Sequence, residues 1–168
     1  MAQTIITLQT SGQGLYEFTA AANDFVRQAG VDIGLLTVFV RHTSASLLIQ
    51  ENADPDVSKD LEAFFARLVP PADDAAMRYL VHRLEGPDDM SAHIKSALTQ
   101  VCLPIPIGNG SLMLGTWQGL YRFEHPDRPH RREVVLHIGL QGKQDEGAAS
   151  FELRLSSRPG TGRHRPKI

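Results

Sequence analysis

The sequence of 168 residues has little cysteine, no long apolar run and almost no net charge. Its single cysteine, Cys102, excludes an internal disulfide bond and every zinc motif that is built on cysteines. A metal site in this chain would therefore need histidine and carboxylate ligands. Seven histidines make such a site possible.

Two classes of partner are disfavoured by these absences. No apolar run approaches the roughly 20 residues that cross a bilayer, and the first ten residues lack the basic and long apolar regions of a signal peptide. The formal net charge of -2 gives no overall basic field for a nucleic acid. We therefore expect a cytoplasmic protein without membrane or nucleic-acid partners, long enough for one domain with a buried core.

The only tryptophan, Trp117, lies in an apolar and glycine-rich stretch, GNGSLMLGTWQGLYRFE, over residues 108–124. The side chains of this stretch alternate with a period of two, which predicts a strand. Gly115 and Gly119 inside a strand indicate a bulge or the close approach of a ligand. Two interpretations stay open, a strand that carries a site and a strand with a tryptophan in the core.

Three other segments have helical spacing. The first is residues 19–29, ended by Gly30 as a C-terminal cap. The second begins at Asp54 and Pro55 and runs to Leu68, before two prolines stop it. The third runs from about Asp89 to Val101 with Asp88 as its N-cap, and its expected buried stripe is Met90, Ile94, Ala97, Leu98 and Val101.

Short strands outnumber these helices. The expected strands are residues 4–10, 34–41 as a central strand, 45–49 as its partner or continuation, 79–84, 103–107 as an edge strand with two prolines, and 133–140. Because helices do not regularly separate the strands, the pattern predicts an α+β domain with a mostly antiparallel sheet. We expect one domain over residues 1–142. Residues 143–168 are then an extension whose proline-rich, basic end is disordered.

A metal site is the first chemical hypothesis. Asp89 and His93 are four residues apart on one predicted helix and share a face, and His82 precedes the turn that leads into this helix. One carboxylate and two imidazoles suit zinc, magnesium or manganese with an open position for water or substrate. Ordinary hydrogen-bonded or surface histidines are the alternative.

A phosphate site is the second hypothesis. His42, Thr43 and Ser44 interrupt an apolar strand, and Asn52 leads into a helix N-terminus, where backbone amides favour an anion. Arg131 and Arg132 follow a polar loop, and an arginine fork fits phosphate. An ordinary N-cap and solvated loop arginines are the alternatives. A serine nucleophile is disfavoured because no G-x-S-x-G motif is present.

Four motifs, in their order and spacing, resemble the YjbQ-type family, to which a secondary thiamine-phosphate synthase activity is often attributed. They are RHTSASLLIQENADPDVSKDL, HRLEGPDDMSAHIKSAL, IPIGNGSLMLGTWQGLYRFEH and RREVVLHIGLQG, and the resemblance covers residues 5–142. It implies a compact α+β sandwich, a homotrimer, and a site of histidines and acidic residues at the subunit boundary. The loop HPDRPH and residues 143–168 depart from the family pattern.

The resemblance also implies site positions. The polar motif positions of the family correspond to His42, Thr43, Ser44, Asn52, Asp60, His82, Asp88, Asp89, His93, Trp117, Gln118, Glu124, Arg131 and Arg132. Among them we assign His42, Glu124, Trp117 and Gln118 to catalysis, and Thr43, Ser44, Asn52, Arg131 and Arg132 to a small phosphorylated metabolite. His82, Asp89 and His93 are assigned as metal ligands, with His42 as the alternative to Asp89.

Three functions are compatible with these assignments. The first is a transferase that joins a pyrimidine pyrophosphate to a thiazole phosphate, with arginines on the leaving pyrophosphate and Trp117 facing the pyrimidine. The second is a metal-dependent hydrolase of a phosphorylated metabolite, in which Glu124 acts as base. The third is a trimer that binds a metabolite without catalysis. We expect an enzyme, and we name the first function as our prediction.

Overall fold

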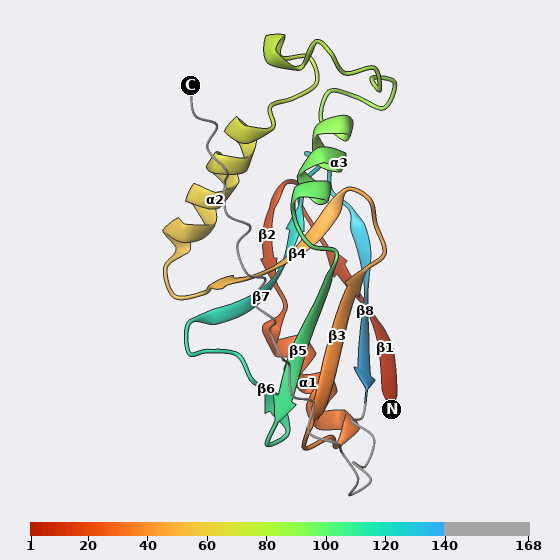
Figure 1. Cartoon of the computed structure of the whole chain (residues 1–168), viewed down its shortest axis with the longest axis vertical. Coiled ribbons are helices and arrows are strands. Elements are labelled where there is room, and N and C mark those ends of the chain that lie inside the picture. Colours follow the sequence, from red (N-terminus) through yellow and green to blue (C-terminus); the bar gives the residue numbers. More distant parts are fainter. Residues whose placement is uncertain (140–168) are drawn as a thin grey trace, which may run out of the picture.

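Residues 1–139 are described by a computed structural model (Figure 1). The described part contains the strands β1 (Ala2–Gln9), β2 (Gly14–Glu17), β3 (Gly34–Val40), β4 (Ala45–Glu51), β5 (Cys102–Gly108), β6 (Ser111–Leu112), β7 (Gln118–Glu124) and β8 (Arg131–Gly139). Its helices are α1 (Thr19–Ala29), α2 (Pro55–Leu68) and α3 (Asp89–Leu98), with one 3-10 turn at Ala75–Met77. The predicted boundary at residue 142 and the extension after it lie outside the described residues.

Two antiparallel sheets form the framework. The larger sheet has the strand order β1-β8-β3-β5-β6, and the smaller has the order β2-β7-β4. The predicted α+β class and mostly antiparallel pairing are therefore confirmed. In the antiparallel register of β4 against β7, Ala45 pairs with Glu124 and Glu51 pairs with Gln118. The two strands are therefore paired along their whole length.

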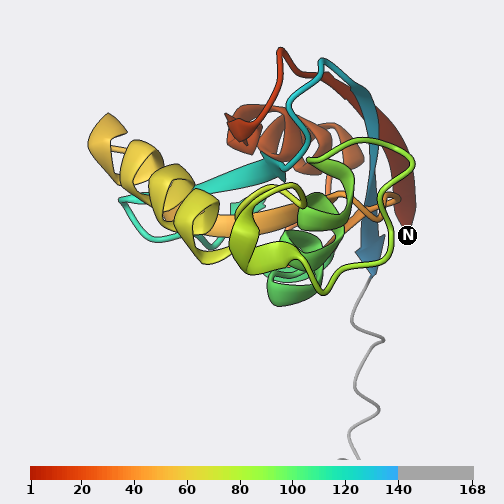
Figure 2. The same cartoon turned by 90° about the horizontal axis from the view of Figure 1, so that it is seen from above.

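The core lies on one face of the larger sheet. Alternate residues of β3 and β8, such as Val38 and Leu136, point into it and meet Ala22 and Val26 of α1 and Leu47 of β4. Figure 2 shows α1 beside the strands, while α2 lies apart at the margin of the molecule. None of the helices in residues 1–139 combines the length and apolar character needed to cross a bilayer.

The opposite face of the larger sheet is partly apolar and is exposed within residues 1–139. Ile5 of β1 and Leu35 and Phe39 of β3 are exposed on it. The helix α2 buries none of its residues, and its Phe64 and Leu68 are also exposed. The described part of the chain therefore presents two separate apolar surfaces.

Several predicted elements are confirmed. The helix α1 has the predicted bounds, and Gly30 ends it with a left-handed φ of 63°. The helix α2 begins after Asp54, whose Oδ1 accepts a hydrogen bond from the amide of Asp56 at 2.9 Å. The strand β3 is central, as its continuous apolar run predicted.

The continuous strand predicted over residues 108–124 is wrong. The chain leaves the larger sheet after Leu112 and enters the smaller sheet at Gln118. Between them the amide of Gln118 donates to the Gly115 carbonyl at 2.9 Å, while Gln118 Oε1 accepts from the Gly115 amide at 2.8 Å. This turn exposes 65% of Trp117, so the core-tryptophan interpretation is also wrong.

Three other predictions need correction. Residues 79–84 form no strand, and of their carbonyls Arg83 binds only that of Leu80. The helix α3 ends at Leu98, and it buries Ser91, Ala92, Lys95 and Ser96 while the predicted Ala97 and Leu98 are exposed. Residues 45–49 continue the chain from β3 but pair in the other sheet.

The predicted edge strand is β5. Within residues 1–139 it has a neighbour on its second side only at Ile107 and Gly108.

Candidate functional site

A cluster of two histidines and one aspartate lies at the start of α3. Asp89 Oδ2 is 2.7 Å from His82 Nε2 and 3.3 Å from His93 Nε2. One ligand atom from each of the three residues falls within a group no wider than 4.8 Å. The structure thus brings together the three side chains that the sequence predicted as metal ligands.

Each member of this cluster is positioned by local structure. Asp89 and His93 are one helical turn apart, so their side chains share a face of α3. The second ring nitrogen of His93, Nδ1, lies 3.0 Å from the backbone carbonyl of Thr43, which fixes the ring with Nε2 toward Asp89. His82 comes from the loop that precedes α3.

Arg83 shapes that loop. Its guanidinium donates to four backbone carbonyls, those of Ala72, Met77, Arg78 and Leu80, at distances from 2.8 to 3.2 Å. The loop is therefore folded around one side chain, next in sequence to His82. Sequence analysis missed Arg83, because a single arginine in a polar segment has no distinguishing pattern.

A cavity of about 180 Å³ adjoins the cluster. Asp88, which precedes α3, does not cap the helix with its side chain but accepts a hydrogen bond from the amide of Asp127 at 3.0 Å. This bond ties the loop after β7 to the start of α3. The cavity is lined by Ser44, Glu85, Asp88, Asp89, Pro126, Arg128 and His130.

Glu124 is fully buried in an ion-pair network. Arg132 Nη2 lies 2.6 Å from its Oε1, and Arg122 Nη1 lies 2.9 Å from its Oε2. The Arg132 contacts are aligned hydrogen bonds, whereas the nitrogens of Arg122 have no aligned acceptor. Glu124, predicted as a catalytic base, is thus occupied by two guanidinium groups.

His42 and Ser44 belong to the edge of this network. Arg132 Nη2 donates to Ser44 Oγ at 3.0 Å, and His42 Nδ1 lies 3.4 Å from Arg132 Nη1. His42 Nε2 accepts from the amide of Glu133 at 3.2 Å. Burial, followed by the charge of Arg132, lowers the pKa of His42, so the neutral ring is favoured.

The two arginines predicted to bind phosphate do not lie together. Arg131 and Arg132 are the first two residues of β8, so their side chains point to opposite faces of the sheet. Arg131 is exposed, and Arg132 is buried against Glu124. The prediction treated both as loop residues and missed this alternation.

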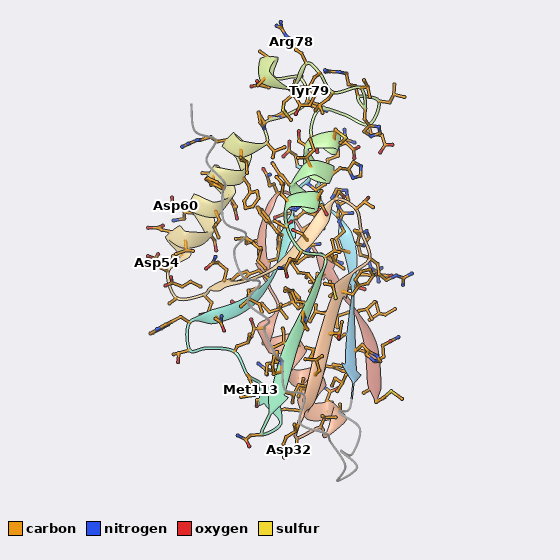
Figure 3. All side chains as sticks on the ribbon, viewed as in Figure 1. Asp32, Asp54, Asp60, Arg78, Tyr79 and Met113 are labelled. Carbon is orange, nitrogen blue, oxygen red and sulfur yellow. The ribbon has the colours of Figure 1, made fainter. Side chains whose placement is uncertain are left out.

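Asn52, Trp117 and Gln118 lie at the far end of β4 and β7. The amide of Asn52 donates to the carbonyl of Trp117 at 3.1 Å. The seven residues of β4, roughly 20 Å of strand, separate this end from Ser44. Asp60 lies further away on the outer side of α2, where Figure 3 shows it directed away from the sheets. Within one chain, the predicted site residues therefore do not form a single group.

Two buried groups near the cluster were missed by sequence analysis. Lys95 follows His93 by two residues on α3, and His125 follows Glu124 at the end of β7. His125 Nε2 is 3.0 Å from Ser46 Oγ, and burial, with smaller effects of Lys95 and Arg132, lowers the pKa of His125 to about 3. Burial also lowers the pKa of Lys95, against the charges of Asp127 and Asp88. A lysine in a helix predicts a solvated side chain, so no pattern in the sequence indicates its burial.

The family profile described as UPF0047 protein YjbQ-like matches residues 4–141 of the chain. The chain belongs to this YjbQ-like family. Two relatives extend the match. A UPF0047 protein of Synechocystis is 55% identical over 136 residues, covering 81% of this chain and 90% of the relative. The protein YjbQ of Escherichia coli O157:H7 is 38% identical over 142 residues, covering 84% and 98%.

Solved structures of YjbQ-like proteins share the fold. A YjbQ/UPF0047 protein of Clostridium acetobutylicum has a TM-score of 0.72 at 36% identity, covering 81% of this chain and 99% of that one. A hypothetical protein of Aeropyrum pernix K1 has a TM-score of 0.75 at 27% identity, covering 84% and 100%. The Clostridium protein is itself described as uncharacterised, so the YjbQ-like family gives the fold without a reaction.

Proposed function

We propose that this YjbQ-like protein is a divalent-metal-dependent enzyme that hydrolyses a small phosphorylated metabolite. The observation that carries the proposal is the convergence of His82, Asp89 and His93 beside a polar cavity. Two imidazoles and one carboxylate leave a coordination position open, as in catalytic metal sites.

The surroundings of the cluster fit a metal. In metal sites, a ligating histidine usually donates its second ring N–H to a carbonyl or carboxylate, and His93 has such a contact with the Thr43 carbonyl. Asp89 hydrogen-bonds His82 and contacts His93, which keeps the three donors close together before an ion binds. A bound zinc or manganese ion would supply Lewis-acid chemistry at the phosphate.

Other residues of the cavity suit the remaining roles. Arg128 and His130 line it and can donate hydrogen bonds to phosphate oxygens. Glu85 also lines it and is exposed, so its carboxylate can take a proton from the attacking water. We assign this role to Glu85 because Glu124 is held by two arginines.

The thiamine-phosphate synthase reaction is the second candidate. It is favoured by the exposure of Trp117, which is available as an aromatic wall for a pyrimidine. Trp117 is distant from the cluster of its own chain, so this reaction requires the Trp117 end of a second copy. We propose a homotrimer in which that end meets the cluster of the neighbouring subunit.

The experiment is an assay of phosphate release from pyrophosphate and a panel of small phosphate esters. Protein stripped with chelator should be inactive and should regain activity with zinc or manganese. His93→Ala should lose the activity, and His137→Ala, on the outer face of β8, should keep it. Formation of thiamine phosphate from the two precursors, without phosphate release from the panel, would favour the transferase. No metal-dependent turnover in either assay would refute the proposed enzyme.

A further inference from the structure

A second, smaller cavity shares Asp88 with the cavity beside the candidate metal cluster. Its volume is about 70 Å³, and it lies between α3, the end of α2 and the turn after β7. Its polar lining consists of Gln13, Asp88, Ser91, Lys95, His125 and Asp127. None of the three proposed metal ligands lines it.

One buried nitrogen atom in this cavity has no partner within residues 1–139. His125 is 1% exposed, and its Nδ1 has no hydrogen-bond partner although its Nε2 contacts Ser46. Lys95, a residue that is 6% exposed, also lines the cavity, and its ammonium group forms no ion pair within 4.0 Å in the described part of the chain. A buried polar group without a partner is costly, so the His125 nitrogen favours a ligand in the cavity, and the Lys95 ammonium adds a positive charge beside it.

The size and the polar lining of the cavity fit a phosphate group. At roughly 10 to 15 Å³ for each water-sized position, the cavity has room for about five to seven heavy atoms, enough for the phosphorus and four oxygens of a phosphate. The Lys95 ammonium and the His125 ring supply donors for its oxygens. The carboxylates of Asp88 and Asp127 would repel a fully deprotonated anion, but they can accept the proton of a P–OH group.

We propose that this cavity binds a protonated phosphate group, with Lys95 and His125 as donors and Asp88 or Asp127 as acceptor. This proposal extends the proposed function. It depends on that function only for the statement that the metabolite is phosphorylated. It adds a phosphate site to the one that Arg128 and His130 line beside the metal cluster, and Arg131 and Arg132 line neither cavity. Sulfate has the same shape but no proton at neutral pH, so the two carboxylates select against it.

The test is calorimetric titration of chelator-treated protein with inorganic phosphate, sulfate and glycerol phosphate. Phosphate should bind and sulfate should not. Lys95→Met should weaken phosphate binding about 10- to 100-fold, the loss of one charged hydrogen bond. Lys59→Met is the matched control, because Lys59 is exposed on α2 and pairs only with Asp56. If Lys95→Met does not fold, His125→Gln provides the same comparison.

Each outcome decides the proposal. Absence of phosphate binding to the parent, equal binding by Lys95→Met and the parent, or equal binding of sulfate overturns it. Binding of glycerol phosphate as well as phosphate identifies the phosphate end of a metabolite, and binding of phosphate alone identifies a free-ion site. His93→Ala should retain phosphate binding. A parent protein that shows no metal-dependent turnover but binds phosphate would therefore refute the proposed function and leave this pocket intact.

Discussion

Glu124 balances the buried positive charges of Arg122 and Arg132. Glu124→Gln would leave two buried guanidinium groups without a counter-charge. We predict that this change lowers the free energy of unfolding by about 3 to 5 kcal/mol, as measured by urea denaturation.

Glu133→Gln is the control for this prediction. Glu133 pairs with Arg41 at 3.3 Å, but both side chains are about half exposed, 51% and 52%. Its loss should cost no more than about 1 kcal/mol. Equal losses for the two variants would show that the buried network stabilises the fold no more than a surface pair.

His125 should make the fold sensitive to acid. Above pH 6.5 its ring is neutral in both folded and unfolded chains and contributes nothing to the pH dependence. Below that value the unfolded chain binds a proton, while the folded chain, with a pKa of about 3, does not. The free energy of unfolding should therefore fall as the pH decreases from 6.5 toward 3.

The measurement is urea denaturation of the parent and His125→Gln at several pH values. Between pH 6 and 4 the parent should lose about 1.4 kcal/mol per pH unit more than the variant. His137→Gln keeps His125 and should behave as the parent does. Parallel curves for the parent and His125→Gln would contradict the assigned pKa.

At the level of elements, the loop before α3 depends on Arg83. Arg83→Ala removes its bonds to four carbonyls and should release His82 from Asp89. We predict that metal affinity falls about tenfold or more, the effect of losing groups that orient ligands. Arg78→Ala is the matched control, because this side chain points outward from the same loop (Figure 3). Unchanged metal affinity in Arg83→Ala would show that the hydrogen bonds of Arg83 are not needed to position His82.

Elements with local signals were predicted from sequence, and elements fixed by distant contacts were not. The helix α1 and its Gly30 cap follow from spacing and one left-handed residue. The strand predicted at residues 79–84 is wrong, and the segment belongs to a loop in which Arg83 binds the Leu80 carbonyl and three carbonyls earlier in the chain. The buried face of α3 was mistaken because its packing against β4 sets which side faces inward.

The candidate site shows the same division. His82, Asp89 and His93 are close in sequence, and helical spacing was enough to group them. Arg131 and Arg132 were grouped wrongly, since adjacent residues of a strand face opposite ways. His125 and Lys95 come from different elements, so only the folded chain reveals that they share a cavity.

At the scale of the whole molecule, the two apolar surfaces predict an assembly. A closed trimer needs two different surfaces on each subunit, because its contacts are head to tail. The exposed residues Leu35 and Phe39 on the larger sheet and Phe64 and Leu68 on α2 provide such a pair. We predict a trimer in sedimentation at micromolar concentration.

Phe39→Glu tests this assembly, because a charge on the sheet face should dissociate the trimer into folded monomers. Arg41 directly follows β3, the strand of Phe39, and pairs with Glu133. Arg41→Glu changes charge without removing an apolar side chain and should weaken assembly less. A parent protein that sediments as a monomer would contradict the assembly and the composite transferase site, but not the metal cluster within one chain.

Competitive titration with a chromogenic chelator tests whether His82, Asp89 and His93 bind a divalent metal. The parent protein, prepared without a nickel column, should take up about one zinc or manganese ion per chain. His82→Ala and His93→Ala should bind at least about tenfold more weakly, and His137→Ala should bind as the parent does. Equal affinity in all four proteins would contradict the account and leave the cluster as a hydrogen-bonded surface group.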